Sequence, residues 1–205
     1  MTSKYIVNKR DIESLLKKDK IFLSVFDKYG SPPNWHREQG FVSLTRIILE
    51  QQVSLASAKA HFNKLKSYIS EITPEKLLSL SDKEFRFCQI SRQKTAYLRS
   101  LSYAVNNKSL ELEKFSGMEK EDIIKTLIQI KGIGQWTADI YLMFCLQHKD
   151  IFPSGDIAVI RSVLELTGVE DKEKIIRMSE NWKPLRSLAA YFFWHFYLCK
   201  RKINK

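Results

Sequence analysis

The chain has 205 residues, of which 44% are hydrophobic and 28% charged, as in globular proteins. Its 34 Lys and Arg outnumber its 23 Asp and Glu, and the formal net charge of +11 favours a polyanionic partner such as nucleic acid or an anionic membrane surface. Three scattered cysteines without metal-ligand spacing argue against a zinc site, an iron–sulfur cluster or a disulfide framework. The charged N-terminus and the lack of a long apolar run argue against a signal peptide and a membrane span.

Apolar residues recur at helical spacing almost throughout, and no segment alternates as a half-buried strand would. The sequence therefore predicts an all-α fold. Its first two helices are expected over 11–17 and 19–29, the second closed by Gly30 and by the breaker at 31–34. The next helix runs into Gln51-Gln52 and carries an apolar face of Phe41, Leu44, Ile47 and Ile48.

Capping signals mark the middle of the chain. Thr73-Pro74 is typical of a helix start, and Ser81 with Glu84 fits a capping box. Apolar stripes predict helices on either side of these caps, formed by Ala58, Phe62 and Leu65, by Tyr97, Leu98, Leu101 and Val105, and by Ile123, Ile124 and Leu127.

Three elements are expected in the C-terminal part. Helices are predicted over 137–146 and 156–166, the second ending at Gly168, with the loop 150–155 between them. An aromatic helix follows Trp182-Lys183-Pro184.

Between the helices at 123–127 and 137–146 lies Lys131-Gly132-Ile133-Gly134. Glycines permit positive φ and carry no Cβ, so backbone N–H groups at the start of the following helix can approach a phosphate closely. Such a contact would position DNA without reading its sequence. Ile133, between the two glycines, would plug the hairpin back into its own helices. The alternative is that this glycine pair forms only a tight helix–helix turn.

Four segments in order carry a family resemblance: LTRIILEQQVSLASA (44–58), IKGIGQWTADIYLMF (130–144), DIFPSGD ending at Asp156, and WKPLRSLAAYFFW ending at Trp194. Together they resemble the helix–hairpin–helix (HhH-GPD) superfamily of DNA glycosylases, specifically the alkylbase or 3-methyladenine glycosylase II branch, over about 41–197. The resemblance implies a single unit, 1–205, of two interwoven helical lobes with a cleft between them. One lobe, 35–147, carries the hairpin, and the other combines 1–34 with 149–205.

The resemblance also assigns the chemistry. The family's catalytic aspartate lies 22 residues after the second hairpin glycine, and 156 − 134 = 22 leads to Asp156. The structural alternative is that Asp156 only caps the helix it opens. Bifunctional relatives carry a nucleophilic lysine at the position of Trp136, which cannot form an imine, so the resemblance implies a monofunctional hydrolase without lyase activity.

A flipped cationic purine stacks well on aromatic rings. By resemblance, Trp194 is the principal stacking residue and Trp136 lines the same pocket, whereas Ile140 stands where some relatives have a tyrosine. The helical spacing of the other aromatic residues in this segment is more typical of core; these are Tyr191, Phe192, Phe193 and Tyr197.

DNA contacts are expected at the hairpin and at the turn after the helix that begins near Phe41; they comprise Gly132, Ile133, Gly134, Gln135, Thr137, Gln51 and Gln52. Gln52 takes the wedge position, which is leucine in some relatives. Lys200-Arg201-Lys202 is either a solvated tail or an electrostatic contact to DNA.

No cofactor is expected to be required, and the four histidines share no metal-ligand spacing. The family's hairpin often binds a monovalent cation, Na⁺ or K⁺, through backbone carbonyls, which would here be those of Ile128, Ile130 and Gly132.

We expect a monomer that acts on damaged duplex DNA inside the cell, with the nucleoid or in a nucleus. The hypothesis is a monofunctional glycosylase that excises alkylated purines in base excision repair. The alternatives are a glycosylase for another damaged base and a non-catalytic DNA-binding protein.

Overall fold

The structure, a computed structural model, describes residues 4–203, and every regular element in that range is helical. The predicted all-α class is therefore confirmed. The elements are α1 (Lys9–Lys18), α2 (Lys20–Tyr29), α3 (Phe41–Glu50), α4 (Leu55–Ile69), α5 (Pro74–Ser79), α6 (Asp82–Phe87), α7 (Arg92–Asn106), the 3₁₀ helix η1 (Leu112–Gly117), α8 (Lys120–Ile128), α9 (Gln135–Phe144), α10 (Ile157–Thr167), α11 (Lys172–Glu180) and α12 (Arg186–Ile203). Among these described helices, none is both long and apolar enough to cross a membrane.

The chain divides into two compact units. The terminal unit combines Met1–His36 with Leu142–Lys205, and the central unit is Arg37–Tyr141. The division falls inside α9, so this helix belongs partly to each unit.

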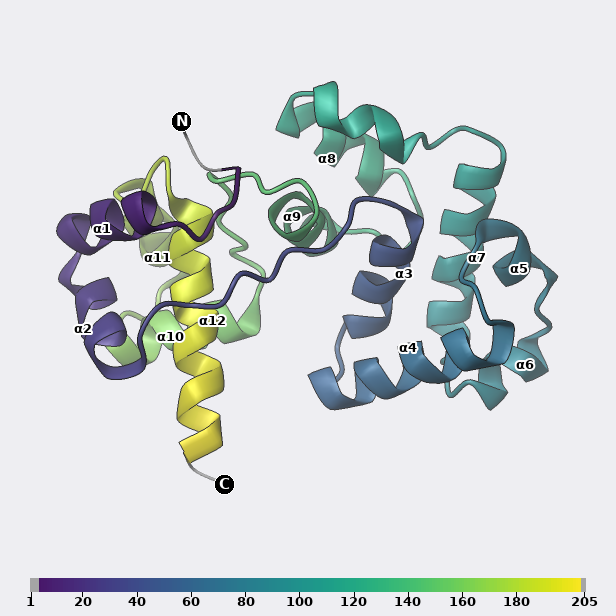
Figure 1. The fold of residues 1–205 in the computed structure, drawn as a ribbon, viewed down its shortest axis with the longest axis horizontal. Coiled ribbons are helices and arrows are strands. Elements are labelled where there is room, and N and C mark those ends of the chain that lie inside the picture. The colour runs from purple at the N-terminus through teal and green to yellow at the C-terminus, as the bar shows by residue number, and fades with distance from the viewer. Residues whose placement is uncertain (1–3, 204–205) are drawn as a thin grey trace. The chain divides into compact units, whose positions relative to one another are not determined.

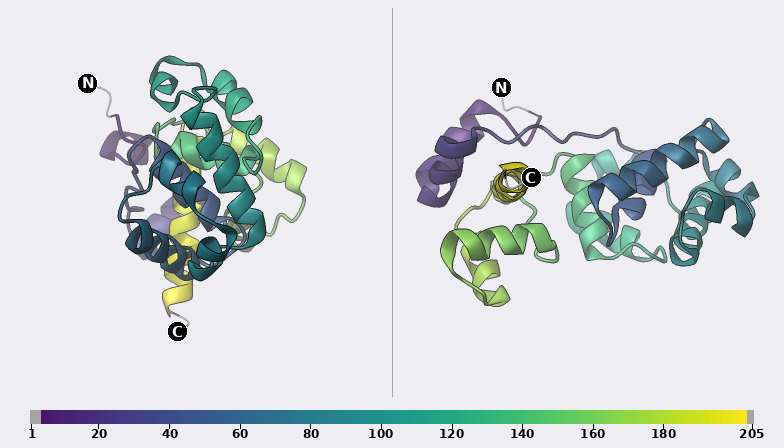
Figure 2. Two further views of the ribbon diagram at one scale, coloured as in Figure 1. Left: turned by 90° about the vertical axis from the view of Figure 1, so that its right-hand side faces the viewer. Right: turned by 90° about the horizontal axis from the view of Figure 1, so that it is seen from below.

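In the terminal unit, α12 packs against α1, α2 and α10 (Figure 1). The right-hand view in Figure 2 looks along α12, with α1 and α2 on one side and α10 on another. Aromatic rings fill the space between these helices: Phe22 contacts Trp182, Phe192 and Phe193 at centroid distances of 5.3, 5.6 and 5.4 Å. All four side chains are fully buried, so α12 is the central helix of this unit.

In the central unit, α7 packs against α3, α5 and α6 (Figure 1). The buried Leu98 and Leu101 form the apolar face of α7 that the sequence predicts. The capping box at Ser81 is confirmed, because its hydroxyl accepts from Glu84 N while the Glu84 carboxylate accepts from Ser81 N at 2.7 Å. Thr73 likewise caps α5, with Pro74 as its first residue.

Some elements differ from the sequence-based expectations. The helix expected over 137–146 is α9, which begins at Gln135 because the Gly134 carbonyl already accepts from Ala138 N at 3.1 Å. Neither η1 nor α11 is predicted by the apolar pattern. The helix α11 is mostly polar and buries Ile175 and Ser179; its Asp171 cap is the signal that could have revealed it.

Candidate active site and DNA interface

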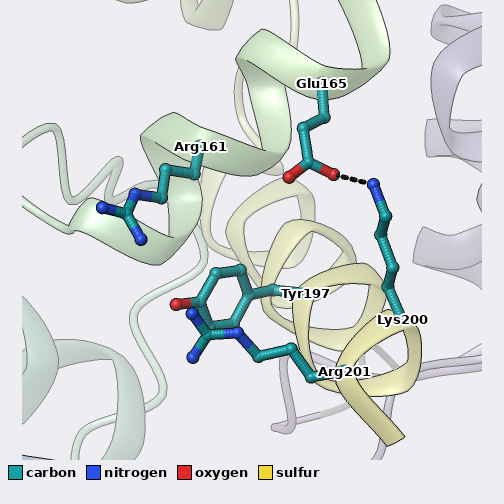
Figure 3. Close-up of a pocket in the computed structure, with 5 residues that line it drawn as sticks. All are labelled: Arg161, Glu165, Tyr197, Lys200 and Arg201. Atoms are coloured by element: carbon teal, nitrogen blue, oxygen red, sulfur yellow. Dashed lines mark hydrogen bonds and ion pairs between the residues drawn. The ribbon is translucent and has the colours of Figure 1, made fainter. Parts of the chain in front are cut away.

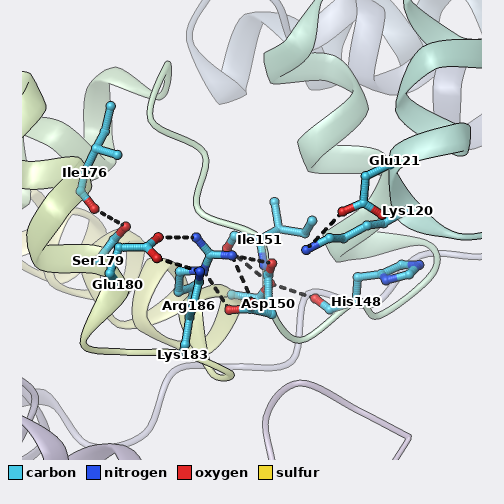
Figure 4. A network of polar contacts seen from close by, with 11 residues as sticks. Lys120, Glu121, His148, Asp150, Ile151, Ile176, Ser179, Glu180, Lys183 and Arg186 are labelled. Atoms are coloured by element: carbon cyan, nitrogen blue, oxygen red, sulfur yellow. Dashed lines mark hydrogen bonds and ion pairs between the residues drawn. The ribbon is translucent and has the colours of Figure 1, made fainter.

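Hydrogen bonds and an ion pair join the loop that leads to Asp156 to the start of α12. Arg186 binds Asp150 through two contacts, Nε to Oδ1 at 2.7 Å and Nη2 to Oδ2 at 2.9 Å, and donates to Glu180 Oε1 at 2.8 Å (Figure 4). Ser187 Oγ donates to the His148 carbonyl at 2.7 Å and accepts from Ile151 N at 3.0 Å. The helix that carries Trp194 therefore also holds the segment that positions Asp156.

Asp156 is the N-cap of α10, so it has the capping role that the sequence offers as the alternative to catalysis. Its Oδ1 accepts hydrogen bonds from Ala158 N at 2.9 Å and Val159 N at 3.0 Å. The same oxygen accepts from Trp194 Nε1 at 3.1 Å. Three donors from two helices thus fix the orientation of a half-buried carboxylate beside an indole ring.

Trp194 differs from the aromatic residues that precede it. Tyr191, Phe192 and Phe193 are completely buried, as their helical spacing predicts, whereas Trp194 is only half-buried. Its ring makes edge contacts with Phe144 and Trp35 at centroid distances of 5.5 and 6.2 Å. Sequence reasoning gave Trp35 no role, because a lone aromatic residue in a loop carries no periodic signal.

The hairpin of the central unit joins α8 to α9. Ile130 N donates to the Leu127 carbonyl at 3.1 Å, and Ile133 N donates to the Ile130 carbonyl at 2.9 Å, which close the turn. The Ile133 side chain is buried, as expected for a plug, although its contact with DNA stays a prediction. Gly134 and Gln135 are exposed at the start of α9, where first-turn amides can approach an anion.

The structure gives a reason for glycine at Gly132 that is separate from the predicted access for a phosphate. The φ of Gly132 is +93°, and a Cβ there would lie 2.1 Å from Tyr97 Cγ. The Tyr97 ring of α7 therefore packs directly on the hairpin backbone. By contrast, a Cβ on Gly134 would meet nothing within 4 Å.

Gln51 and Gln52 face different surroundings at the end of α3. Gln51 Nε2 donates to the Gly132 carbonyl at 2.8 Å and to Thr137 Oγ1 at 2.9 Å, so it braces the hairpin. The Thr137 side chain is buried, and only its position in the first turn of α9 suits a DNA contact. Gln52 is exposed and adopts a left-handed conformation with φ of 53°. DNA contact by either glutamine stays a prediction, and the wedge role suits the exposed Gln52.

Trp136 and Ile140 lie on α9 in the central unit. Trp136 is half-buried, whereas Ile140 is only 3% exposed. Their participation in a pocket with Trp194 stays a prediction.

Asp139 is a buried acidic side chain to which the sequence analysis assigns no role. It is 5% exposed, and its Oδ1 accepts from Gln135 Nε2 at 2.8 Å. Burial raises the pKa of its carboxyl to about 6, although the hydrogen bond from Gln135 lowers it in part. One turn into α9, this carboxyl therefore orients a side chain that is expected at the DNA interface.

We expect Asp139→Asn to stabilise the protein at pH 7.5, by about 1–2 kcal/mol. The folded protein holds the Asp139 proton more tightly than the unfolded chain, so wild-type stability falls as the pH rises from about 4 through about 6. The asparagine amide carries no charge, so the variant does not lose stability over this pH range. Its oxygen can still accept the hydrogen bond from Gln135 Nε2. Urea unfolding at pH 4 and pH 7.5 measures the effect, and an equal difference between the two proteins at both pH values would contradict it.

Among the described residues, no group of three or more His, Cys, Asp or Glu side chains could hold a metal ion. The proposed cation ligands are instead backbone carbonyls at the hairpin. Those of Ile130 and Gly132 each accept one hydrogen bond, from Ile133 N and Gln51 Nε2. A carbonyl oxygen has two lone pairs, so each of these oxygens can accept a further partner, and cation binding stays a prediction.

Comparison with known proteins gives concordant matches. A DNA-3-methyladenine glycosylase 1 of Schizosaccharomyces pombe is 28% identical over 207 residues, which cover 92% of this chain and 91% of that protein. The solved structure of S. pombe Mag1, a 3-methyladenine DNA glycosylase in complex with abasic DNA, matches with a TM-score of 0.84 and 28% identity over 91% of this chain and 95% of Mag1. A DNA-3-methyladenine glycosidase of Bacillus halodurans matches with a TM-score of 0.77 and 27% identity over 95% of this chain and 92% of that structure.

The hairpin, the buried Ile133 plug and Asp156 lie in the region that a family model also matches, and Trp194 lies just beyond it. That model describes the HhH-GPD superfamily of base excision DNA repair proteins, and it covers residues 45–187. The chain belongs to the HhH-GPD superfamily of base excision DNA repair proteins.

Proposed function

We propose that this protein is a monofunctional DNA glycosylase that flips alkylated purines of the 3-methyladenine type out of duplex DNA and excises them by hydrolysis. The hydrogen bond from Trp194 Nε1 to Asp156 Oδ1 is the observation that carries the proposal. The names of the relatives support the substrate class. This activity would take place with the chromosomal DNA, in a nucleoid or a nucleus.

The chemistry requires negative charge near the anomeric carbon. The bond between C1′ and the purine nitrogen breaks, its electron pair stays with the base, and C1′ becomes cationic. The Asp156 carboxylate stabilises this cation electrostatically. Water then adds to C1′ and releases a proton, for which Asp156 is the nearby acceptor.

An alkylated purine is a good leaving group because it is already cationic. The departing electron pair neutralises it, so no second carboxylic acid is needed to protonate it. The half-buried indole of Trp194 offers an electron-rich face to such a base, and stacking contributes about 1–3 kcal/mol per base. Trp136 and Ile140 would complete the pocket.

Base flipping requires contacts that hold the DNA backbone and a side chain that fills the space left by the flipped base. The hairpin would hold a phosphate at the start of α9 through Gly134 and Gln135, and Gln52 would enter the vacated stack. A monovalent cation at the carbonyls of Ile128, Ile130 and Gly132 would add positive charge for the same phosphate.

The experiment is to incubate the protein with duplex DNA that carries methylated purines and to separate the released bases by chromatography. We expect 3-methyladenine to appear while the strand stays uncut until alkali is added. We also expect borohydride to trap no covalent complex, because Trp136 offers no amine for an imine.

Matched duplexes with uracil or 8-oxoguanine in the same sequence serve as controls for the lesion class. Release of only these bases would assign the protein to another damaged base, and DNA binding without release of any base would make it a non-catalytic binder. Borohydride trapping would contradict the monofunctional assignment.

A further inference from the structure

A small hollow lies between α10 and α12 in the terminal unit, and Asp156 is not among the residues that line it. Figure 3 shows its lining: Arg161 and Glu165 from α10, and Tyr197, Lys200 and Arg201 from α12. Its volume is about 210 Å³. Sites that enclose drug-sized molecules occupy roughly 300–1,000 Å³, so this hollow suits a smaller group.

The charges in the hollow do not balance. Lys200 Nζ pairs with Glu165 Oε2 at 2.5 Å on one side. On the other side, Figure 3 shows the Arg201 guanidinium beside the Tyr197 ring, and Arg161 projects from the neighbouring helix α10. Neither arginine has an ion pair with any residue of the described chain, and the Lys202 side chain lies outside the described residues.

One of these guanidinium groups lies over the Tyr197 ring. Arg201 Cζ lies 4.0 Å from the centre of the Tyr197 ring, a cation–π contact that leaves the N–H edge of the guanidinium available. Arg161 is exposed on the neighbouring helix. Two planar, permanently charged donors from different helices thus border one opening, the arrangement that favours a phosphate.

The hollow lies close to the Asp156–Trp194 pair along both helices. Arg161 follows Asp156 by 161 − 156 = 5 residues, or about 7.5 Å along a helix, and Tyr197 follows Trp194 by 197 − 194 = 3, less than one turn. Nucleotides in one strand advance by about 3.4 Å each. A group one or two nucleotides from the reacting sugar is therefore within reach of the arginine side chains.

We infer that this hollow binds a backbone phosphate of the damaged strand, next to the flipped nucleotide, through Arg161 and Arg201. The inference rests on the proposed function, because that function puts the sugar at Asp156. It adds a second phosphate contact, in the terminal unit, to the one expected at the hairpin.

The test measures the affinity for duplex DNA containing a stable abasic-site analogue over a range of salt concentrations. Arg161→Ala and Arg201→Ala are each expected to weaken binding about tenfold and to reduce the salt slope by about 0.9, the value for one lost phosphate contact. Arg10→Ala is the matched control, since it removes the same charge from an exposed position on α1 of the same unit.

A second arm locates the phosphate. Methylphosphonate linkages, which carry no charge, replace one phosphate at a time on the damaged strand. Wild-type protein is expected to lose affinity at one flanking position. Arg161→Ala and Arg201→Ala should each lose less at that same position, and the double variant should show no further loss there.

The inference is overturned if both arginine variants behave like Arg10→Ala, or if neutralising each phosphate weakens the variants as much as the wild type. The salt dependence and the methylphosphonate series both measure DNA affinity and do not depend on base excision. A protein that shows the coupling but releases no base would disprove the proposed function while keeping the phosphate contact.

Discussion

Asp156→Asn is expected to lower the rate of base excision on the order of 10³-fold. Asparagine has nearly the same shape and is an equally good N-cap, so its Oδ1 can keep the hydrogen bonds from Ala158 N, Val159 N and Trp194 Nε1. Only the negative charge that stabilises the cationic sugar is lost. Single-turnover excision from a duplex with one methylated purine measures the change, and affinity for abasic duplex DNA should stay within a few-fold of wild type.

The matched control is Asp171→Asn in the same unit. Asp171 is the N-cap of α11, and its Oδ1 accepts from Glu173 N at 2.8 Å and Lys174 N at 3.1 Å, as Asp156 does for α10. This variant should excise bases at the wild-type rate. If Asp156→Asn also retained full activity, Asp156 would be a structural cap only.

Most of the fold follows from local signals in the sequence. Thr73-Pro74, Ser81 with Glu84, and Gly168 each mark a helix end where the structure has one, because a cap depends on groups three or four residues apart. The helix α11 was missed because only a narrow part of it is buried, so its polar sequence lacks a clear apolar stripe.

The site residues are likewise only partly predictable from the sequence. The family resemblance leads to Asp156, through its spacing from Gly134, and to Trp194, but it does not reveal that the two side chains share a hydrogen bond. Contacts between distant segments have no periodic trace in the sequence. The clearest case is Gln51, which reaches the Gly132 carbonyl across 81 residues and so supports the hairpin from another element.

Gly132 has one role that the sequence predicts and a different one that the structure shows. The sequence pattern predicts that the hairpin glycines let a phosphate approach the backbone. In the structure Gly132 also lies against Tyr97, with a Cβ predicted to fall 2.1 Å from Cγ and 2.4 Å from Cδ1 of the ring. A separation under 3 Å cannot be accommodated without moving the ring or the hairpin.

Gly132→Ala is therefore expected to lower the free energy of unfolding by about 3–5 kcal/mol, from backbone strain at positive φ and from overpacking against Tyr97. Urea unfolding measures it, and adding Tyr97→Ala should recover part of the overpacking loss but not the backbone strain. Gly134→Ala is the control: with open space at its Cβ, it should change stability by less than about 0.5 kcal/mol. It should nevertheless weaken DNA binding, because the new methyl group would stand between the hairpin and a phosphate. Equal stability of Gly132→Ala and wild type would show that the Tyr97 contact does not constrain the hairpin.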